Sequence, residues 1–252
     1  MLQTSCSTNY QPPRSGPRWE FVGSVQSMHS RVAKEPAPRR LSRVDMLADY
    51  GIAGDRHACP HSPRQILIAG DAAYERFGLP EATLRENVRI DFSTKDLRSG
   101  DLRIGSDVML WLTFHCEPCS LLERRQPGTI NTIRRHRGTL ARVLSGGSFG
   151  VGDKVSLTSA ALPAMSDDWQ ARVLGVASAV PAGHYIIYRQ LAEMAGVANA
   201  YCRAFAKVLS RLPAEVSSRV VGAASALPGP LWSGAELFNV AQYFDQGTPK
   251  PE

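Results

Sequence analysis

Residues 107–119, DVMLWLTFHCEPC, join an apolar stretch to two cysteines that lie three positions apart. Residues 107–114 are rich in apolar, β-branched and aromatic side chains, a composition that predicts a strand. A cysteine pair at this spacing has three ordinary explanations: half of a zinc site, a redox pair, or two small buried residues. A zinc site would need two more ligands, for which Cys59 and His61 are the nearest candidates in the chain.

Further strand-like segments lie on both sides of this stretch. Residues 20–28 alternate in polarity and residues 64–70 form a short apolar run, so each is predicted to be a strand. Gly-Asp pairs mark turns between such segments, and residues 71–78 predict a short helix. Many short strands with frequent turns indicate a mainly-β domain with a closed or folded-over sheet, over residues 19–160.

The pattern becomes helical after the small-residue stretch at 158–168. Two aspartates open an amphipathic helix there, and a domain boundary is predicted near residue 160. Residues 161–252 then form a second, α-helical domain, and residues 1–18, rich in Ser, Pro, Gln and Asn, form a flexible N-terminal arm.

Within the helical part, residues 189–196 predict a helix that ends at Gly196. A second helix is predicted over 199–213, capped by Asn199 and stopped by Pro213. A helix, a turn with glycine and another helix form the helix-turn-helix pattern.

Composition limits the possible classes of protein. The chain has 252 residues, 43% of them hydrophobic, and a formal net charge of +6. No apolar run is long enough for a membrane span, and the N-terminus lacks the apolar core of a secretory signal. Five cysteines, an odd and low number, argue against a disulfide scaffold and for a reducing compartment, so we expect a cytoplasmic protein.

The helix predicted over 199–213 carries one basic face. Arg203, Lys207 and Arg211 are spaced by four residues, and no acidic residue occurs between Glu193 and Glu215. A solvated basic stripe on an ordinary helix explains this pattern on periodicity alone. A DNA-recognition helix would also need a residue directed at the bases.

Residues 173–213, with 217–223, resemble the DNA-binding domain of O6-alkylguanine-DNA alkyltransferases and of alkyltransferase-like proteins. The resemblance rests on PAG at 181–183, on YRQLAEMAG at 188–196, and on an Arg that opens a helix ending at a Pro. It implies that Arg203 enters the base stack in place of a flipped nucleotide, and that Tyr188 turns the adjacent phosphate. The DNA-contacting residues that we predict are Tyr188, Arg203, Lys207, Arg211, Ser217 and Arg219.

The reactive motif of the alkyltransferases is missing from this chain. Where that family has Pro-Cys-His-Arg, residues 216–219 are VSSR, so both the alkyl-acceptor cysteine and its histidine are absent. Serine without a base is a poor nucleophile. We therefore expect no alkyl transfer, and the domain is more similar to the alkyltransferase-like proteins, which bind modified bases without repairing them.

Residues 20–158 resemble the MOSC domain, which is named after the C-terminal part of molybdenum cofactor sulfurase. Six elements occur in the family's order: GIAGDRH, RQILIAG, LRENVRI, SGDLRIGSDVMLWLT, EPC and LSGGSFGVGDKVSL. The predicted fold is therefore a mainly-β MOSC barrel with short helices. A small α-helical, helix-turn-helix (winged-helix-like) domain follows it.

The MOSC resemblance implies a site around Cys119, the cysteine of the family's Pro-Cys element. In members that bind molybdopterin cofactor this cysteine is the sulfur ligand of molybdenum, and thiolate suits such a metal; Cys116 has a structural or resolving role. The implied cofactor-binding residues are Arg85, Asn87, Asp55, His57 and Arg64; Arg85 and Asn87 match positions that contact the pterin, and Asp55 and His57 shape the pocket. His57 has an equally good explanation as a hydrogen-bonded turn residue.

Together the two resemblances imply an enzyme that reduces N-hydroxylated or otherwise modified bases at molybdenum. Its partners would be DNA, a small modified-base substrate and a separate electron-donor protein, because the chain shows no flavin, Fe–S or Rossmann motif. One alternative is a non-catalytic sensor of modified bases in DNA, with a MOSC domain that holds no cofactor. A further alternative is a sulfur carrier that acts through Cys119.

Overall fold

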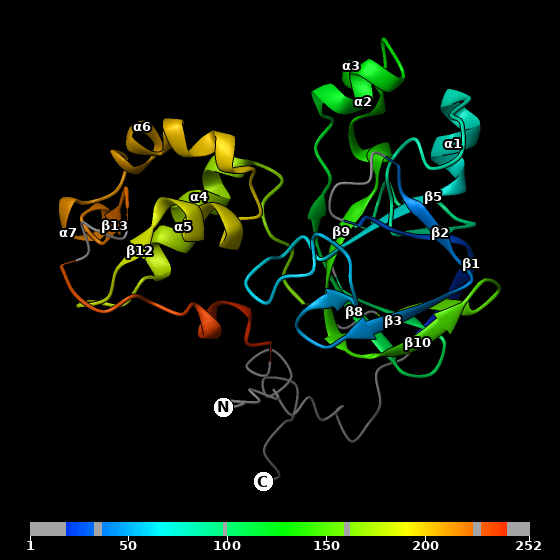
Figure 1. The fold of residues 1–252 in the computed structure, drawn as a ribbon, viewed down its shortest axis with the longest axis horizontal. Coiled ribbons are helices and arrows are strands. Elements are labelled where there is room, and N and C mark those ends of the chain that lie inside the picture. The colour runs from blue at the N-terminus through cyan, green and yellow to red at the C-terminus, as the bar shows by residue number, and fades with distance from the viewer. Residues whose placement is uncertain (1–18, 33–36, 98–99, 159–161, 224–227, 241–252) are drawn as a thin grey trace, which may run out of the picture.

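The computed structural model describes residues 19–32, 37–97, 100–158, 162–223 and 228–240. A mainly-β barrel is followed by a helical region that packs beside it (Figure 1). The predicted arm over 1–18 and the predicted boundary at residue 160 lie outside the described residues.

Seven strands close into a barrel in the order β11-β7-β8-β9-β5-β6-β1, and β1 pairs back onto β11. Adjacent strands are antiparallel except β5 and β6, which are parallel. The predicted closed sheet is thus confirmed, and closure removes the unpaired edges of an open sheet. The barrel strands are β1 (Trp19–Ser30), β5 (Ile66–Gly70), β6 (Val88–Ile90), β7 (Asp101–Ile104), β8 (Val108–His115), β9 (Thr139–Ser145) and β11 (Lys154–Thr158).

Four further short strands accompany the barrel. One strand, β2 (Arg39–Leu41), pairs with the end of β1. A separate three-stranded sheet has the order β10-β3-β4, formed by β3 (Arg43–Leu47), β4 (Gly51–Ile52) and β10 (Gly147–Gly150).

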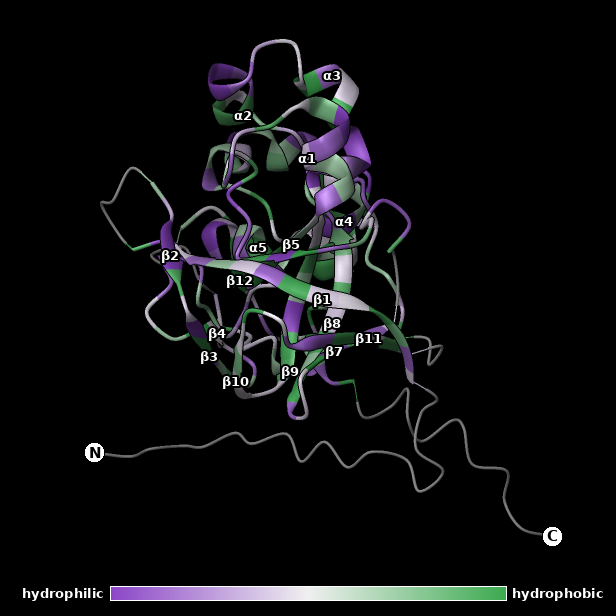
Figure 2. Ribbon diagram, turned by 90° about the vertical axis from the view of Figure 1, so that its right-hand side faces the viewer, coloured by the Kyte–Doolittle hydropathy of each residue, from purple (hydrophilic) through white to green (hydrophobic). Residues whose placement is uncertain are grey.

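Strands β1 and β8 show why the sequence patterns differ between segments. Hydrophilic and hydrophobic residues succeed one another along β1 (Figure 2), whose first half is partly exposed. All eight residues of β8 are buried, because Leu110 and Leu112 face the barrel core while Trp111 packs against the helical region. A strand buried on both faces reads as a continuous apolar run.

Short helices gather at one end of the barrel (Figures 1 and 2). They share a small apolar cluster that includes Tyr74, Leu122 and Ile133. The chain leaves β8 at this end and passes through both cysteines before the second helix. The helices are α1 (Asp71–Phe77), α2 (Ser120–Arg125), α3 (Ile130–Ile133) and the 3₁₀ helix η1 (Arg134–Arg137).

The helical region begins with α4, whose N-cap is Asp168 as its acidic start predicts; its carboxylate accepts from the backbone N–H of Gln170 at 2.9 Å. Strands β12 and β13 form a parallel pair. The elements are α4 (Trp169–Ala179), β12 (Ile186–Ile187), α5 (Tyr188–Met194), η2 (Asn199–Ala204), α6 (Phe205–Leu209), α7 (Ala214–Ser217), β13 (Val220–Val221) and η4 (Ala235–Phe238).

Gly196 ends α5 as predicted, and its φ of +63° is one that glycine adopts without strain. A Cβ at this position would lie 2.8 Å from Cζ of Phe114 in β8. Glycine is therefore required both for the turn and for the close approach of α5 to the barrel.

The single helix predicted over 199–213 is wrong. The chain forms the 3₁₀ helix η2 and then the five-residue α6, which ends four positions before Pro213. Asn199 is not the cap, because the N-cap of η2 is Ala198 and no side chain caps it. Asn, Tyr and Cys favour α-helix weakly, and 3₁₀ turns are common at helix starts.

This break also changes the predicted basic face, and the pairing of β12 with β13 changes the predicted winged-helix form. Arg203 lies in η2, Lys207 in α6 and Arg211 beyond it, so a spacing of four residues no longer places all three on one helix face. Because β12 and β13 are parallel, they do not form the hairpin that a wing requires. The helix-turn-helix assignment stays a prediction.

Candidate functional site

Cys119 lies just before α2 and is half-buried. Burial, the largest single influence, raises the pKa of its thiol, but the backbone N–H of Leu122 and the charge of Arg137 outweigh it. The pKa of Cys119 is therefore lowered overall, which favours the nucleophilic and metal-binding thiolate.

Arg137, at the end of η1, connects Cys119 to two other segments. This buried guanidinium donates from Nε to the carbonyl oxygen of Glu117 (3.1 Å) and from Nη1 to that of Leu84 (2.7 Å). Its Nη2 lies 3.8 Å from Sγ of Cys119. Burial lowers the pKa of Arg137, but the nearby thiols of Cys116 and Cys119 raise it overall.

Arg85 brings a second positive charge near Cys119. Burial and then the charges of Arg125, Arg56 and Arg137 lower the pKa of Arg85, while Cys119 raises it. Its φ of +57° is unusual for a residue with a side chain. Such backbone strain is often found at functional sites. The effect of Cys119 on the pKa of Arg85 indicates that the two predicted site residues lie in one neighbourhood.

Asn87 and Asp55 are buried, and their hydrogen bonds hold the segments of this cluster together. The side-chain amide of Asn87 accepts from Leu67 N (3.0 Å) and Arg31 Nη2 (2.7 Å), and donates to His29 O (3.3 Å) and Asp55 Oδ2 (3.0 Å). These four bonds use the full capacity of an asparagine. Asn87 is thus engaged within the barrel, where it holds Arg31 and Asp55, and its contact with a cofactor stays a prediction.

The carboxylate of Asp55 shapes the turn that follows it. It accepts from the backbone N–H groups of Arg31 (2.7 Å) and His57 (2.8 Å). Burial among protein atoms, followed by arginine charges of which those of Arg31 and Arg56 are the largest, lowers the pKa of His57 to about 3. With its pKa lowered this far, the exposed imidazole of His57 is neutral near pH 7.

Arg64 is directed to another part of the molecule. Its Nη1 donates to the carbonyl oxygen of Gly196 at 2.9 Å, at the end of α5. The predicted cofactor contact of Arg64 thus competes with a bond that joins the barrel to the helical region.

The predicted DNA-contacting residues lie in the helical region, apart from the Cys119 cluster. Arg203, Lys207 and Arg211 are exposed. Tyr188 is partly buried and packs edge-on to Phe205, with ring centroids 5.5 Å apart. Two others are engaged locally: Ser217 Oγ donates to Ala214 O (3.3 Å) and Arg219 Nη1 to Val180 O (2.7 Å).

The zinc explanation of the cysteine pair is not supported. Among the residues that the structure describes, no three His, Cys, Asp or Glu side chains are grouped so that they could hold a metal. The thiol of Cys59 donates to the carboxylate of Glu193 in α5 instead. Cys116 and Cys119 are free thiols, and Cys116 is buried.

Sequence reasoning missed the arginines that surround Cys119. Arg137 ends a basic run, RRHR, which was the only signal available for it. Arg56 lies within the element GIAGDRH but was not singled out there, and Arg31 belongs to none of the six elements. Their proximity to Arg85 follows from barrel closure, which sequence spacing does not reveal.

Residues 57–156 match the MOSC domain family. The match covers 100 of the 252 residues and includes Cys116, Cys119, Arg85 and Asn87. MOSC domains are associated with binding of the molybdopterin cofactor, and this match is compatible with oxidoreductase or sulfurase-like chemistry. The helical region after residue 168 is outside this match. No helix within the described residues has the length and apolar character needed to cross a membrane.

Solved structures with similarity to the chain include YuaD from Bacillus subtilis, at 17% identity and a TM-score of 0.48, over 56% of this chain and 98% of that one. YiiM from Escherichia coli has 16% identity and a TM-score of 0.42, over 79% of this chain and 99% of that one. YiiM from Geobacillus stearothermophilus has 16% identity and a TM-score of 0.41, over 76% and 99%. No curated protein matches the chain in sequence.

Proposed function

We propose that the chain binds molybdopterin cofactor through Cys119 and reduces N-hydroxylated or otherwise modified bases. One observation carries the proposal: a half-buried thiol with a lowered pKa lies beside the buried Arg137, with Arg85 nearby. A soft sulfur ligand next to guanidinium groups suits a metal cofactor that carries a phosphate.

The residues present fit such a cofactor in kind. The site offers a single thiolate and no cage of three metal-binding side chains among the described residues, which suits a metal that brings its other ligands with it. Arg85 and the exposed Arg56 supply planar donors of the kind that pair with phosphate oxygens. Asp55 accepts from backbone and Asn87 donors, and Arg31 lies 3.8 Å from its carboxylate and offsets its negative charge.

When bound, molybdenum would supply the two electrons that convert an N-hydroxy group and two protons into an amine and water. The chain's own residues would bind and orient. Arg137 would hold the sulfur of Cys119, Arg85 would bind the anionic part of the cofactor, and the neutral His57 would offer a hydrogen bond without further positive charge. A separate protein would donate the electrons.

The exposed basic residues of the helical region favour a second function, the non-catalytic sensing of modified bases in DNA. Arg203, Lys207 and Arg211 are exposed, and the segment between Glu193 and Glu215 has no acidic residue. The hydroxyl of Ser217, which stands in the altered reactive motif, is hydrogen-bonded to the carbonyl oxygen of Ala214. We therefore do not propose an alkyl-transfer activity. In the reductase proposal, the same basic residues would bring the MOSC domain to DNA.

The deciding experiment is metal analysis with pterin fluorescence on protein from a host that makes molybdenum cofactor. We expect an equimolar amount of molybdenum in the parent, its loss in Cys119→Ala, and its retention in the matched control Cys116→Ala. Absence of molybdenum from the parent would overturn the proposal and favour the sensor. A persulfide on Cys119 in metal-free protein would instead favour the sulfur carrier.

A further inference from the structure

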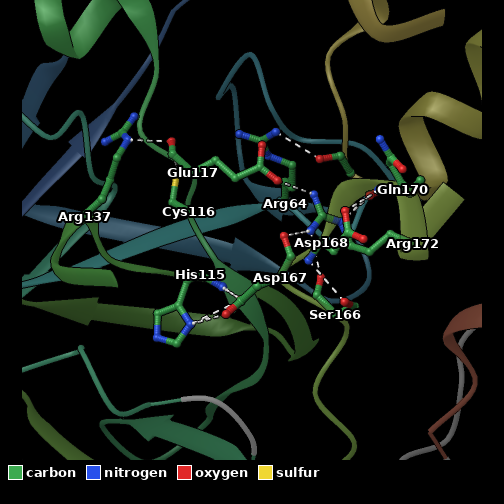
Figure 3. Close-up of polar contacts among 12 residues, drawn as sticks. Arg64, His115, Cys116, Glu117, Arg137, Ser166, Asp167, Asp168, Gln170 and Arg172 are labelled. Carbon is green, nitrogen blue, oxygen red and sulfur yellow. Dashed lines mark hydrogen bonds and ion pairs between the residues drawn. The ribbon is translucent and has the colours of Figure 1, made fainter. Parts of the chain in front are cut away.

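Arg172 in α4 is a buried cation, with 3% of its surface exposed. Its Nε donates to the carbonyl oxygen of Ala195 (2.9 Å), and its Nη1 to those of Ser166 (2.7 Å) and Asp167 (3.0 Å). Its Nη2 donates to Oε1 of Glu117 at 2.9 Å, as Figure 3 shows. A buried guanidinium is costly unless its donors are satisfied, so this side chain fixes how four segments meet.

The same guanidinium lies over the ring of Phe114, with its central carbon 3.8 Å from the ring centroid. A cation in this position is attracted by the face of the ring. Phe114 is the last residue but one of β8, and the chain continues from this strand directly into the cysteine pair. Arg172 therefore contacts the barrel where the Cys119 segment begins.

Glu117, between the two cysteines, is held through both its side chain and its backbone. The carboxylate is bound by Arg172, and the carbonyl oxygen accepts from Nε of Arg137 at 3.1 Å. Arg137 also reaches Sγ of Cys119. Pro118 follows with a fixed φ, so the position of Cys119 depends on two buried arginines that act on Glu117.

We propose that Arg172 is a positioning residue for Cys119 that acts through Glu117, so that α4 is a structural part of the Cys119 site. The inference rests on the proposed function only in taking Cys119 as the reactive group. Without the ion pair, the carboxylate of Glu117 returns to solvent. The 116–119 segment then samples positions in which Arg137 no longer meets the sulfur.

Two variants test this coupling, and Glu117→Gln, at the more exposed partner, carries the smaller risk to folding. Glu117→Gln keeps the shape of a half-exposed side chain and removes its charge, and Arg172→Lys keeps the charge but loses the planar fork. In cofactor-free protein, amide hydrogen exchange in peptides covering 112–125 is expected to be roughly threefold to tenfold faster in each variant. The double variant should exchange no faster than the faster single variant, because the two residues act as one unit.

Asp49→Asn is the matched control. Asp49 pairs with Arg142 at 3.2 Å, and Arg142 is buried, lies 4.3 Å from the ring centroid of Phe238 and likewise joins the barrel to the C-terminal part. Arg142 also donates to the carbonyl oxygens of Pro60 (2.8 Å) and Ser62 (3.2 Å), which lie outside the cysteine segment, so Asp49→Asn should leave exchange in 112–125 unchanged. Parent-like exchange in both test variants, or equal acceleration in Asp49→Asn, would overturn the proposal.

A second readout concerns the sulfur itself. Molybdenum-loaded Glu117→Gln is expected to lose its metal on dialysis several-fold faster than the parent, and Asp49→Asn to lose it at the parent's rate. Equal loss from Glu117→Gln and the parent would overturn the positioning of Cys119. If the parent holds no molybdenum, the proposed function fails, and hydrogen exchange alone decides on the role of Arg172.

Discussion

The thiols of Cys119 and Cys59 differ in what surrounds them. Burial raises the pKa of Cys59 to about 11, and its bond to the carboxylate of Glu193 acts in the same direction. Cys119 has backbone N–H groups and Arg137 beside its sulfur, which lower its pKa despite burial. Because only the thiolate reacts rapidly, the two cysteines should separate clearly in a chemical test.

We predict that iodoacetamide at neutral pH modifies Cys119 faster than Cys59 by roughly tenfold or more, measured by mass spectrometry of the peptides from cofactor-free protein. The thiolate forms as the pH rises through the pKa, so the rate at Cys119 should rise at lower pH than the rate at Cys59. Arg137→Gln removes a stabilising charge and should slow Cys119 alone. Equal rates at both cysteines in the folded parent would contradict the assignment of Cys119 as the reactive thiol.

At the scale of single elements, the long apolar segments could be predicted from sequence and the short ones could not. β1, β5, β8 and α1 follow from the polarity pattern, because burial of whole faces imposes that pattern on the chain. The break between η2 and α6 depends on tertiary contacts that outweigh weak helix propensity.

The candidate site shows the same division between local and distant signals. Cys119 and Arg85 belong to motifs and could be found. The bonds from Arg172 to Glu117 and from Arg31 to Asn87 join residues 55 and 56 positions apart, and nothing in one sequence pairs them. Such contacts become visible only once the barrel and helices are assembled.

The η2–α6 element carries a prediction about DNA. If Arg203 occupies the base stack, Arg203→Ala should weaken binding to a duplex roughly tenfold or more at fixed salt, measured by fluorescence anisotropy. Arg189→Ala is the control, because it removes an equal charge from an exposed position on α5. Equal weakening by both variants would show general attraction to phosphate and contradict a recognition role for Arg203.

In the whole molecule, the barrel and the helical region share one apolar cluster. Met109, Trp111 and Leu144 of the barrel belong to the same buried cluster as Val176 and Phe205 of the helical region. Trp111 Nε1 also donates to the carbonyl oxygen of Pro163 at 3.1 Å, where the chain passes from one part to the other. Separation of the two parts would expose the large aromatic side chain of Trp111 to solvent.

We therefore predict that the two parts unfold together. Chains of this length often unfold in separate steps, but the shared cluster makes each part depend on the other. Thermal unfolding followed by far-UV circular dichroism and by tryptophan fluorescence should give one coincident transition. Trp111→Ala should lower its midpoint for both probes, with a loss of about 3–5 kcal/mol in the free energy of unfolding. Two well-separated transitions in the parent would show that the helical region is only tethered to the barrel, and Arg172 could then not hold the Cys119 segment in place.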